Sequence, residues 1–176
     1  MTSEAIEDLA RLVHEDYLRR RGSGGHAAGG PGAGMTASGT GGDPASGAGD
    51  GDPALAPWEE LPEALRASNR AQAADIVRKL ASLGLEVVPA GVAGGHALVL
   101  DDEQVEQLGR DEHRRFVEER LAAGWRLGPQ RDPVAHTSPT LVGWDELSEP
   151  LRDLDRDAVR LIPRLLEQAG LAVRDR

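Results

Sequence analysis

An internal repeat constrains the fold of this chain more than any other feature of its sequence. Two segments align without gaps: WEELPEALRASNRAQAADIVRKLASLGLEV, which begins at Trp58, and WDELSEPLRDLDRDAVRLIPRLLEQAGLAV, which begins at Trp144. Upstream, a second pair aligns in the same way, IEDLARLVHEDYLRRR from Ile6 and VEQLGRDEHRRFVEER from Val105. Such self-similarity indicates that one small supersecondary unit occurs twice. We therefore expect two tandem copies, residues 1–100 and residues 101–176.

The first helix of each copy is predicted from its periodicity and its start signal. Apolar residues recur at helical spacing from Ser3 to Arg21. In the second copy, Asp101 and Gln104 form a potential capping box, which predicts a helix that ends near Ala123.

A short helical turn and a longer helix are expected after each tryptophan. Asn69, with the glutamine three residues later, resembles another capping box and predicts a helix start there; Asp155 occupies the equivalent position. Gly84 and Gly170 are placed to end these helices in a left-handed cap. Pro163 lies inside the second of them and predicts a kink or a later start.

Short strands and one disordered insert complete the expected elements. Residues 85–88 are predicted to form a strand with residues 96–100 as its antiparallel partner, and residues 171–174 to form a final strand. Residues 22–53 are rich in Gly, Ala, Ser and Asp and contain no Ile, Leu or Val. Such a segment buries too little apolar surface to offset its ordering entropy, so we expect a disordered Gly-rich insert.

Composition excludes several classes of function. The chain has no cysteine, which excludes disulfides, thiolate metal sites and cysteine nucleophiles. Its formal net charge of −10 argues against nucleic acid as a partner and against an anionic membrane surface. No stretch approaches the roughly 18 apolar residues of a membrane span, and the acidic N-terminus does not resemble a secretory signal. We expect a cytoplasmic protein without a cofactor.

The second copy resembles a known family. The segment EHRRFVEERLAAGWRLGPQRDPVAHTSPTLVGWDELSEPLRDLDRDAVR is similar to the RyR domain, the repeat of ryanodine receptors that also occurs in soluble bacterial proteins. The matching positions are Gly124, Trp125, Gly128, Arg131, Asp132, Pro139, Leu141, Val142, Trp144, Leu147, Asp155 and Arg156. In the first copy they are Trp58, Leu61, Ser68, Asn69 and Arg70.

Some positions depart from the family pattern. Phe116 and Tyr17 stand where a tryptophan is common, Leu127 replaces an aromatic residue and Ser138 replaces a histidine. The first copy lacks the loop that begins with Trp125 in the second copy. If that loop makes a ligand site, only the second copy supplies it.

The resemblance implies both a fold and a class of function. The implied fold is α+β and mainly helical: two tandem repeats in a pseudo-twofold arrangement, each with two main helices and short antiparallel strands. The implied function is a non-enzymatic binding or regulatory module. For bacterial members the implied ligand is a nucleotide-derived small molecule.

The candidate ligand site is expected in the cleft between the two copies, where it would combine arginines and aromatic residues from both. Arg70 and Arg156 would open equivalent helices, and a helix N-terminus beside an arginine suits a phosphate. A loop tryptophan beside arginines can stack on a base. The alternative is that Asn69 and Asp155 are helix caps, that the arginines pair with carboxylates and that Trp125 fills a core. The candidate residues are Tyr17, Asn69, Arg70, Phe116, Trp125, Arg131, Asp155 and Arg156.

Other prominent side chains are expected to be structural. Trp58 and Trp144 each begin a Trp-x-x-Leu-x-x-x-Leu stripe, which is typical of a core position. His14 and His113 share one helical position, and neither has a second histidine at metal-binding spacing, so we expect no metal site.

Two alternatives to ligand binding follow from the sequence. A protein-interaction module fits the acidity and the apolar faces equally well. An enzyme is the weaker alternative, because neither a P-loop nor a G-x-S-x-G nucleophile motif occurs. It would rest only on the scattered acids Asp132, Asp155 and Asp157.

Overall fold

The computed structural model describes residues 2–22, 53–132 and 134–176. The insert that the sequence predicts to be disordered therefore lies almost wholly outside the described residues. The described chain is mainly helical with a small antiparallel sheet, as predicted.

The two halves of the chain contain similar successions of elements. The first half contains α1 (Ser3–Gly22), the 3-10 turns η2 (Pro53–Leu55) and η3 (Trp58–Glu60), α2 (Glu63–Ser82) and β1 (Leu85–Pro89). The second half contains α3 (Asp102–Ala122), β2 (Arg126–Leu127), β3 (Thr137–Ser138), the 3-10 turn η4 (Trp144–Glu146), α4 (Glu149–Arg160), α5 (Ile162–Gln168) and β4 (Leu171–Asp175).

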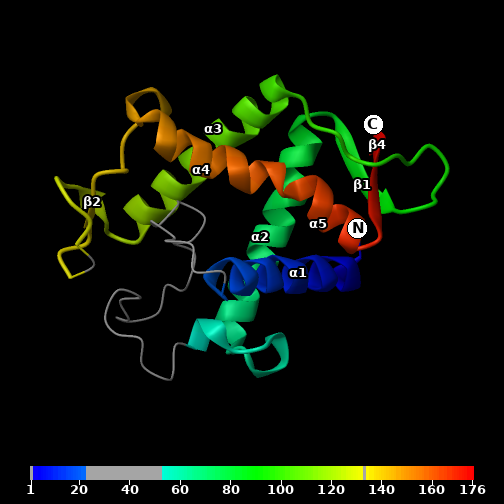
Figure 1. The fold of residues 1–176 in the computed structure, drawn as a ribbon, viewed down its shortest axis with the longest axis horizontal. Helices are drawn as coiled ribbons and strands as arrows, with labels where there is room; N and C mark the ends of the chain where they lie inside the picture. Colours follow the sequence, from blue (N-terminus) through cyan, green and yellow to red (C-terminus); the bar gives the residue numbers. More distant parts are fainter. Residues whose placement is uncertain (1, 23–52, 133) are drawn as a thin grey trace.

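The helices pack in pairs, and the sheet joins the two halves at one end (Figure 1). Helix α1 packs across α2, and α3 likewise packs across α4. Strands β1 and β4 lie side by side at the end of the molecule opposite β2 and the loop around it. Helix α5 also contacts α1, which adds a helical contact between the halves.

Strands β1 and β4 form an antiparallel pair that is centred on Val87 and Val173. These two valines occupy equivalent positions of the aligned segments, and the register is symmetric about them: Leu85 lies opposite Asp175, and Pro89 opposite Leu171. Both valines are buried, at 5% and 0% exposure.

The predicted partner of residues 85–88 is wrong. Residues 96–100 form no strand, and His96 makes only an isolated antiparallel bridge to Val173, on β4. Strand β1 instead pairs with the distant β4, which was correctly predicted as a strand. A partner in the other half of the chain leaves no local pattern, because apolar alternation specifies a strand without specifying its neighbour.

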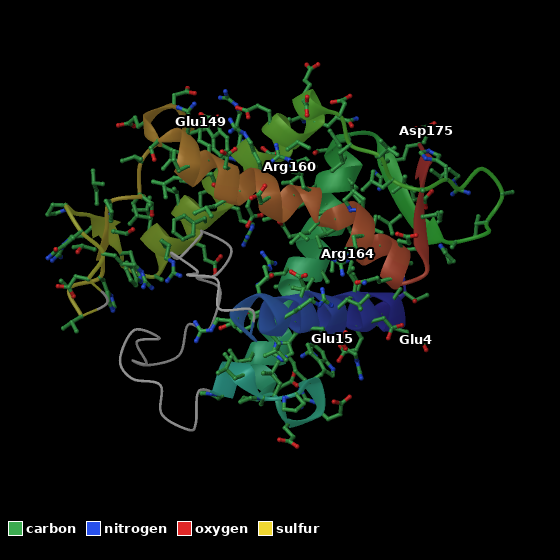
Figure 2. The ribbon with its side chains drawn as sticks, in the orientation of Figure 1. Glu4, Glu15, Glu149, Arg160, Arg164 and Asp175 are labelled. Atoms are coloured by element: carbon green, nitrogen blue, oxygen red, sulfur yellow. The ribbon has the colours of Figure 1, made fainter. Side chains whose placement is uncertain are left out.

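The predicted starts of α2 and α4 are also wrong. Helix α2 begins at Glu63 and α4 at Glu149, so Asn69 and Asp155 lie inside these helices. Pro62 precedes α2, and Pro150 occupies the first turn of α4, where a missing N–H costs nothing. Glu149 and Arg160 mark the two ends of α4 in Figure 2.

Several local predictions are confirmed. Helix α1 spans the predicted segment, and Asp101 and Gln104 form the reciprocal capping box of α3. Gly84 and Gly170 follow their helices with φ values of 77° and 64°, the left-handed region that favours glycine. The last helix breaks beside Pro163, between α4 and α5.

One hydrophobic core draws on both halves. Its largest fully buried side chains come from the helices of each half and from β4: Leu9, Leu80, Leu108, Val159, Leu166 and Val173. None of the described helices carries an apolar stretch long enough to cross a membrane.

Candidate functional site

The loop that follows α3 presents a half-buried tryptophan among cationic and aromatic side chains. Gly124, with φ 82°, ends α3 and turns the chain into Trp125. The imidazole of His136 stacks on the indole at a centroid distance of 5.4 Å and an interplanar angle of 6°. The guanidinium carbons of Arg120 and Arg131 lie 4.9 Å and 5.8 Å from the indole centroid. We call these four residues the Trp125 cluster.

The Trp125 cluster concentrates positive charge in an acidic protein. Burial, together with the neighbouring charge of Arg131, lowers the pKa of Arg120. Within the described part of the chain, no carboxylate lies within ion-pair distance of Arg131. Two guanidinium groups that repel one another beside an aromatic face are suited to an anion attached to a planar group.

The loop around the Trp125 cluster is held by its own backbone contacts. Strands β2 and β3 pair in parallel, and Asp132 and Thr137 exchange two backbone hydrogen bonds of 2.9 Å. The carboxylate of Asp132 accepts from the amides of Val134 and Ala135, both at 2.9 Å. His136 adopts φ 52°, the one positive φ outside glycine among the described residues. Asp132 therefore closes the turn that presents His136.

Phe116 is linked to the Trp125 cluster through Arg120. The guanidinium carbon of Arg120 lies 5.5 Å from the Phe116 ring as well as 4.9 Å from that of Trp125. Phe116 itself is 8% exposed and packs 6.1 Å from the imidazole of His113. Of the predicted site residues, the structure thus associates Phe116, Trp125 and Arg131.

Arg156 lies elsewhere and is surrounded by carboxylates. Its guanidinium contacts Glu106 of α3 at 2.7 Å and, within α4, Glu149 at 2.5 Å and Asp153 at 2.9 Å. Hydrogen bonds to these carboxylates, Glu106 first, raise the pKa of Arg156. The guanidinium also lies over the buried ring of Trp144, at 5.6 Å.

Arg70 has the corresponding environment in the first half. It pairs with Glu7 of α1 and Glu63 of α2, which align with the two glutamates that bind Arg156. Neighbouring Asn69 donates from Nδ2 to the carbonyl oxygen of Leu65 at 2.9 Å. The prediction that Arg70 and Arg156 sit at helix N-termini is therefore wrong, and the alternative of carboxylate pairing is confirmed.

Each half repeats one set of contacts around its buried tryptophan. The Nε2 atom of His14 lies 2.8 Å from the carbonyl oxygen of Ala56, and Nε2 of His113 lies 2.8 Å from that of Val142. Each imidazole packs on the tryptophan of its own half, at centroid distances of 6.0 Å and 5.9 Å. Trp58 and Trp144 are 6% and 7% exposed, so the core assignment of both tryptophans and both histidines is confirmed.

Tyr17 is the first-half counterpart of Phe116. Its ring stacks on His14 at 6.3 Å, and the guanidinium carbon of Arg21 lies 5.9 Å from its centroid. Arg21 aligns with Arg120. The first half therefore repeats the aromatic–arginine contact, while no described residue there corresponds to the loop of Trp125.

A cavity of about 410 Å³ lies between α2 and α3. Its polar lining consists of Asp75, Arg78, Arg115 and Glu119, and no aromatic side chain lines it. Arg78 pairs with Asp75, while Arg115 contacts both Asp75 and Glu119. The cationic groups of this cavity therefore already have carboxylate partners.

A buried ionic cluster lies beside this cavity. Lys79 of α2 pairs with Asp75 and with Glu112 of α3, and Arg115 also contacts both carboxylates. Burial raises the pKa of the Asp75 and Glu112 carboxyls. The charges of Lys79 and Arg115 outweigh this effect, so both pKa values lie below the usual range. This cluster ties α2 to α3 and hence one half of the molecule to the other.

Sequence reasoning missed two members of the Trp125 cluster. Arg120 carried a signal, because it aligns with Arg21 and lies one helical turn after Phe116. His136 carried none: its position depends on the turn that Asp132 closes, which brings the imidazole onto the indole.

Comparison with known proteins bears on the second half of the chain. No curated protein matches the chain. The family model of the RyR domain matches residues 100–175, which supports the family resemblance for the part of the chain that carries the Trp125 cluster.

Proposed function

We propose that this chain is a non-enzymatic binding module that senses a small anionic, nucleotide-like ligand. The observation that carries the proposal is the Trp125 cluster, in which Arg120 and Arg131 flank one half-buried indole. A base would have to replace the imidazole of His136 on the indole face, and guanidinium groups bind phosphate through paired N–H donors. Repulsion between the two guanidinium groups would be relieved by a bound anion.

We place the anion at the Trp125 cluster and not in the cavity between α2 and α3. The arginines of the cavity are paired with Asp75 and Glu119, so a phosphate there would have to displace a carboxylate. Arg131 is exposed and would not have to give up an ion pair with any described residue. Of the predicted site residues, we retain Phe116, Trp125 and Arg131 and add Arg120 and His136.

We further propose that the chain consists of two RyR-like copies related by a pseudo-twofold axis. The symmetric register about Val87 and Val173 supports this, since an axis through that pair would exchange β1 and β4. The repeated contacts of His14 and His113 with a backbone carbonyl and a tryptophan support it independently. The copies are unequal in this proposal, because only the second has the Trp125 loop.

Thermal unfolding in the presence of candidate ligands tests the binding proposal. We expect ADP, ADP-ribose, cyclic AMP or pyrophosphate to raise the Tm, because a ligand at 100 times its Kd adds about 2.7 kcal/mol of stability. Arg131→Gln should weaken that ligand about 10- to 100-fold, since hydrogen bonds to charged groups contribute about 1.5–3 kcal/mol. Trp125→Ala should abolish the shift.

Arg126→Gln is the matched control for the Trp125 cluster. Arg126 is an exposed arginine of the same loop, so the variant removes the same charge without touching the cluster. The ligand-dependent rise in Tm should survive in it. The binding proposal fails if none of the ligands changes the Tm, or if Arg126→Gln and Arg131→Gln weaken binding equally.

A second candidate function is a protein-interaction module that uses the same loop. Leu127 and Val134 are exposed apolar side chains of this loop, at 59% and 95%, which another polypeptide would cover in this proposal. Leu127→Ser should abolish capture of such a partner and leave the nucleotide-dependent Tm unchanged. A nucleotide effect that is lost in Leu127→Ser would contradict this separation of the two functions.

A further inference from the structure

Asp155 is a buried carboxyl group whose oxygens find no hydrogen-bond donor in the described part of the chain. It lies in the middle of α4 with 0% of its side chain exposed. Within the described residues, neither carboxyl oxygen has a hydrogen-bond partner. The nearest cationic candidate is Nδ1 of His113 on α3, which lies 3.6 Å from Oδ2. A bare carboxylate in such a place would carry a large desolvation cost.

The protonation of His113 follows from its other nitrogen. Nε2 lies 2.8 Å from the carbonyl oxygen of Val142, and a carbonyl oxygen only accepts, so Nε2 carries a hydrogen. In a neutral imidazole, Nδ1 would then present a lone pair to the carboxylate of Asp155. Two electron-rich atoms would face one another in a site from which water is excluded. One proton held by the pair removes this repulsion, whether it resides on the imidazole or on the carboxyl.

We propose that His113 and Asp155 together retain one proton at neutral pH and form a pH-sensitive latch between α3, α4 and the segment 141–144. The latch closes through the hydrogen bond from the His113 imidazole, on α3, to the backbone carbonyl oxygen of Val142 in this segment. Loss of the proton leaves a buried carboxylate against a lone pair and loosens the segment. That segment ends the loop of the Trp125 cluster, although the latch itself does not depend on the binding proposal.

The groups around the pair are consistent with a retained proton. Trp144 and Phe116 flank the imidazole and supply no charge. Glu112 on α3 and Lys79 on α2 also act on Asp155, in opposite directions, and they pair with one another. The net effect of burial and Glu112, against His113 and Lys79, is to raise the pKa of Asp155. Burial lowers the pKa of His113, but Asp155 and the Val142 carbonyl outweigh it and raise it overall.

The first half of the chain provides an internal comparison. His14 has the same contact with a backbone carbonyl, but Asn69 stands at the position that aligns with Asp155. An amide does not ionise, so no proton has to be retained there. The second half, which carries the Trp125 loop, therefore has a buried titratable group beside its histidine that the first half lacks at the aligned position.

The sign of the pH dependence follows from the raised pKa values. In the unfolded chain, His113 loses its proton near pH 6.5 and Asp155 near pH 3.9. The folded pair keeps one proton to higher pH, so its contribution is complete below about pH 6.5 and is lost as pH rises through the folded pKa. In that window the unfolding equilibrium constant should rise up to about tenfold per pH unit.

Urea unfolding between pH 6 and pH 9, with two variants of α4, tests the latch. In Asp155→Asn, which copies the first half, we expect this part of the pH dependence to disappear. Asp157→Asn is the matched control: it removes one carboxylate from the same helix, where Asp157 is 65% exposed and pairs with Arg160. It should keep the wild-type slope. Equal slopes in wild type and Asp155→Asn would overturn the proposal.

NMR of the wild-type protein gives an answer even if Asp155→Asn does not fold. The imidazole nitrogens of His113 and the carboxyl carbon of Asp155 report directly on the proton. At pH 7 we expect either a charged imidazole or a protonated carboxyl. A neutral imidazole beside an ionised carboxyl would overturn the proposal. Above the transition, the amides of residues 141–143 should lose protection in the wild-type protein, measured against the intrinsic exchange rate at each pH.

Discussion

Lys79 is the single lysine of the chain, and it is 6% exposed among carboxylates. The positions that align with Asp75, Lys79 and Glu112 in the other half are apolar: Leu161, Leu165 and Val13. The aligned positions are therefore charged where α2 meets α3 and apolar in the other half. Buried ion pairs contribute little net stability, but removal of one partner leaves an uncompensated charge.

Substitution of Lys79 tests whether loss of one partner leaves an uncompensated buried charge. Lys79→Met should lower the free energy of unfolding by about 3–5 kcal/mol, because two buried carboxylates lose a partner. Arg78→Met is the control: Arg78 pairs with the same Asp75 but its side chain is 63% exposed, so the cost should stay below about 1 kcal/mol. Urea unfolding at pH 7 measures both.

A triple variant tests whether the buried ionic cluster stabilises the protein or whether its charges only have to be paired with one another. Asp75→Leu with Lys79→Leu and Glu112→Val installs the residues of the other half, and Arg115 keeps its ion pair with Glu119. It should recover most of the stability lost in Lys79→Met, because apolar replacements of a buried ionic cluster are often neutral or better. A triple variant less stable than Lys79→Met would show that the cluster stabilises the junction in its own right.

At the scale of elements, the loop between α3 and η4 depends on one close backbone approach. A Cβ added at Gly128 would lie 2.6 Å from Cβ of Thr137, too near the backbone to be relieved by a side-chain rotation. Gly128 therefore lets β2 and β3 pair, and this pairing positions the turn that carries His136.

Gly128→Ala should disrupt this loop and weaken the Trp125 cluster. We expect the stacking of His136 on Trp125 to be lost, which a change in tryptophan fluorescence would report, with a cost of about 1–3 kcal/mol from overpacking. Gly143→Ala is the control, because a Cβ there meets only the flexible carboxylate of Glu146, at 3.3 Å. If both variants behave like the wild type, the β2–β3 pairing does not hold the cluster.

Elements with local signals were predictable, and those set by distant partners were not. The capping box of Asp101 and the glycine stops act within one helical turn, so the sequence contains their whole cause. The starts of α2 and α4 were misplaced because Asn69 and Asp155 resemble caps, whereas the proline-bearing segments before them begin the helices. The partner of β1 lies in the other half of the chain and leaves no local trace.

The residues of the candidate site were likewise predictable where the signal is local and not where it depends on distant contacts. Trp125 and Arg131 were predicted from a loop motif, and the structure places both in one cluster. Arg70 and Arg156 were misread, because the glutamates that hold them come partly from α1 and α3. Only the packing of one helix on another reveals that these guanidinium groups are occupied. No sequence pattern indicates the proton that we propose for Asp155 and His113, because it follows from the burial of one side chain against the other.

At the scale of the whole molecule, the two halves share one core and one sheet. Strand β4 has its antiparallel partner in the first half, and Leu9 of α1 belongs to the same core as Leu166 of α5. Residues 101–176 alone would leave β4 without β1 and expose part of that core.

Fragments test this dependence. We expect residues 101–176 to lack a cooperative thermal transition by circular dichroism, and an equimolar mixture with residues 1–100 to regain helicity and a transition, because each fragment supplies apolar surface that the other buries. The fragment Tm should rise with concentration. A cooperative transition of residues 101–176 alone would contradict the shared core.

The indole N–H signals of the three tryptophans test whether the Trp125 cluster binds an anionic, nucleotide-like ligand. In a titration of the ¹⁵N-labelled protein with ADP-ribose, ADP or cyclic AMP, the Trp125 signal should move and saturate. The signals of Trp58 and Trp144, which are 6% and 7% exposed, should stay in place. No movement of the Trp125 signal at millimolar ligand, or movement of the two buried tryptophans alone, would contradict the claim.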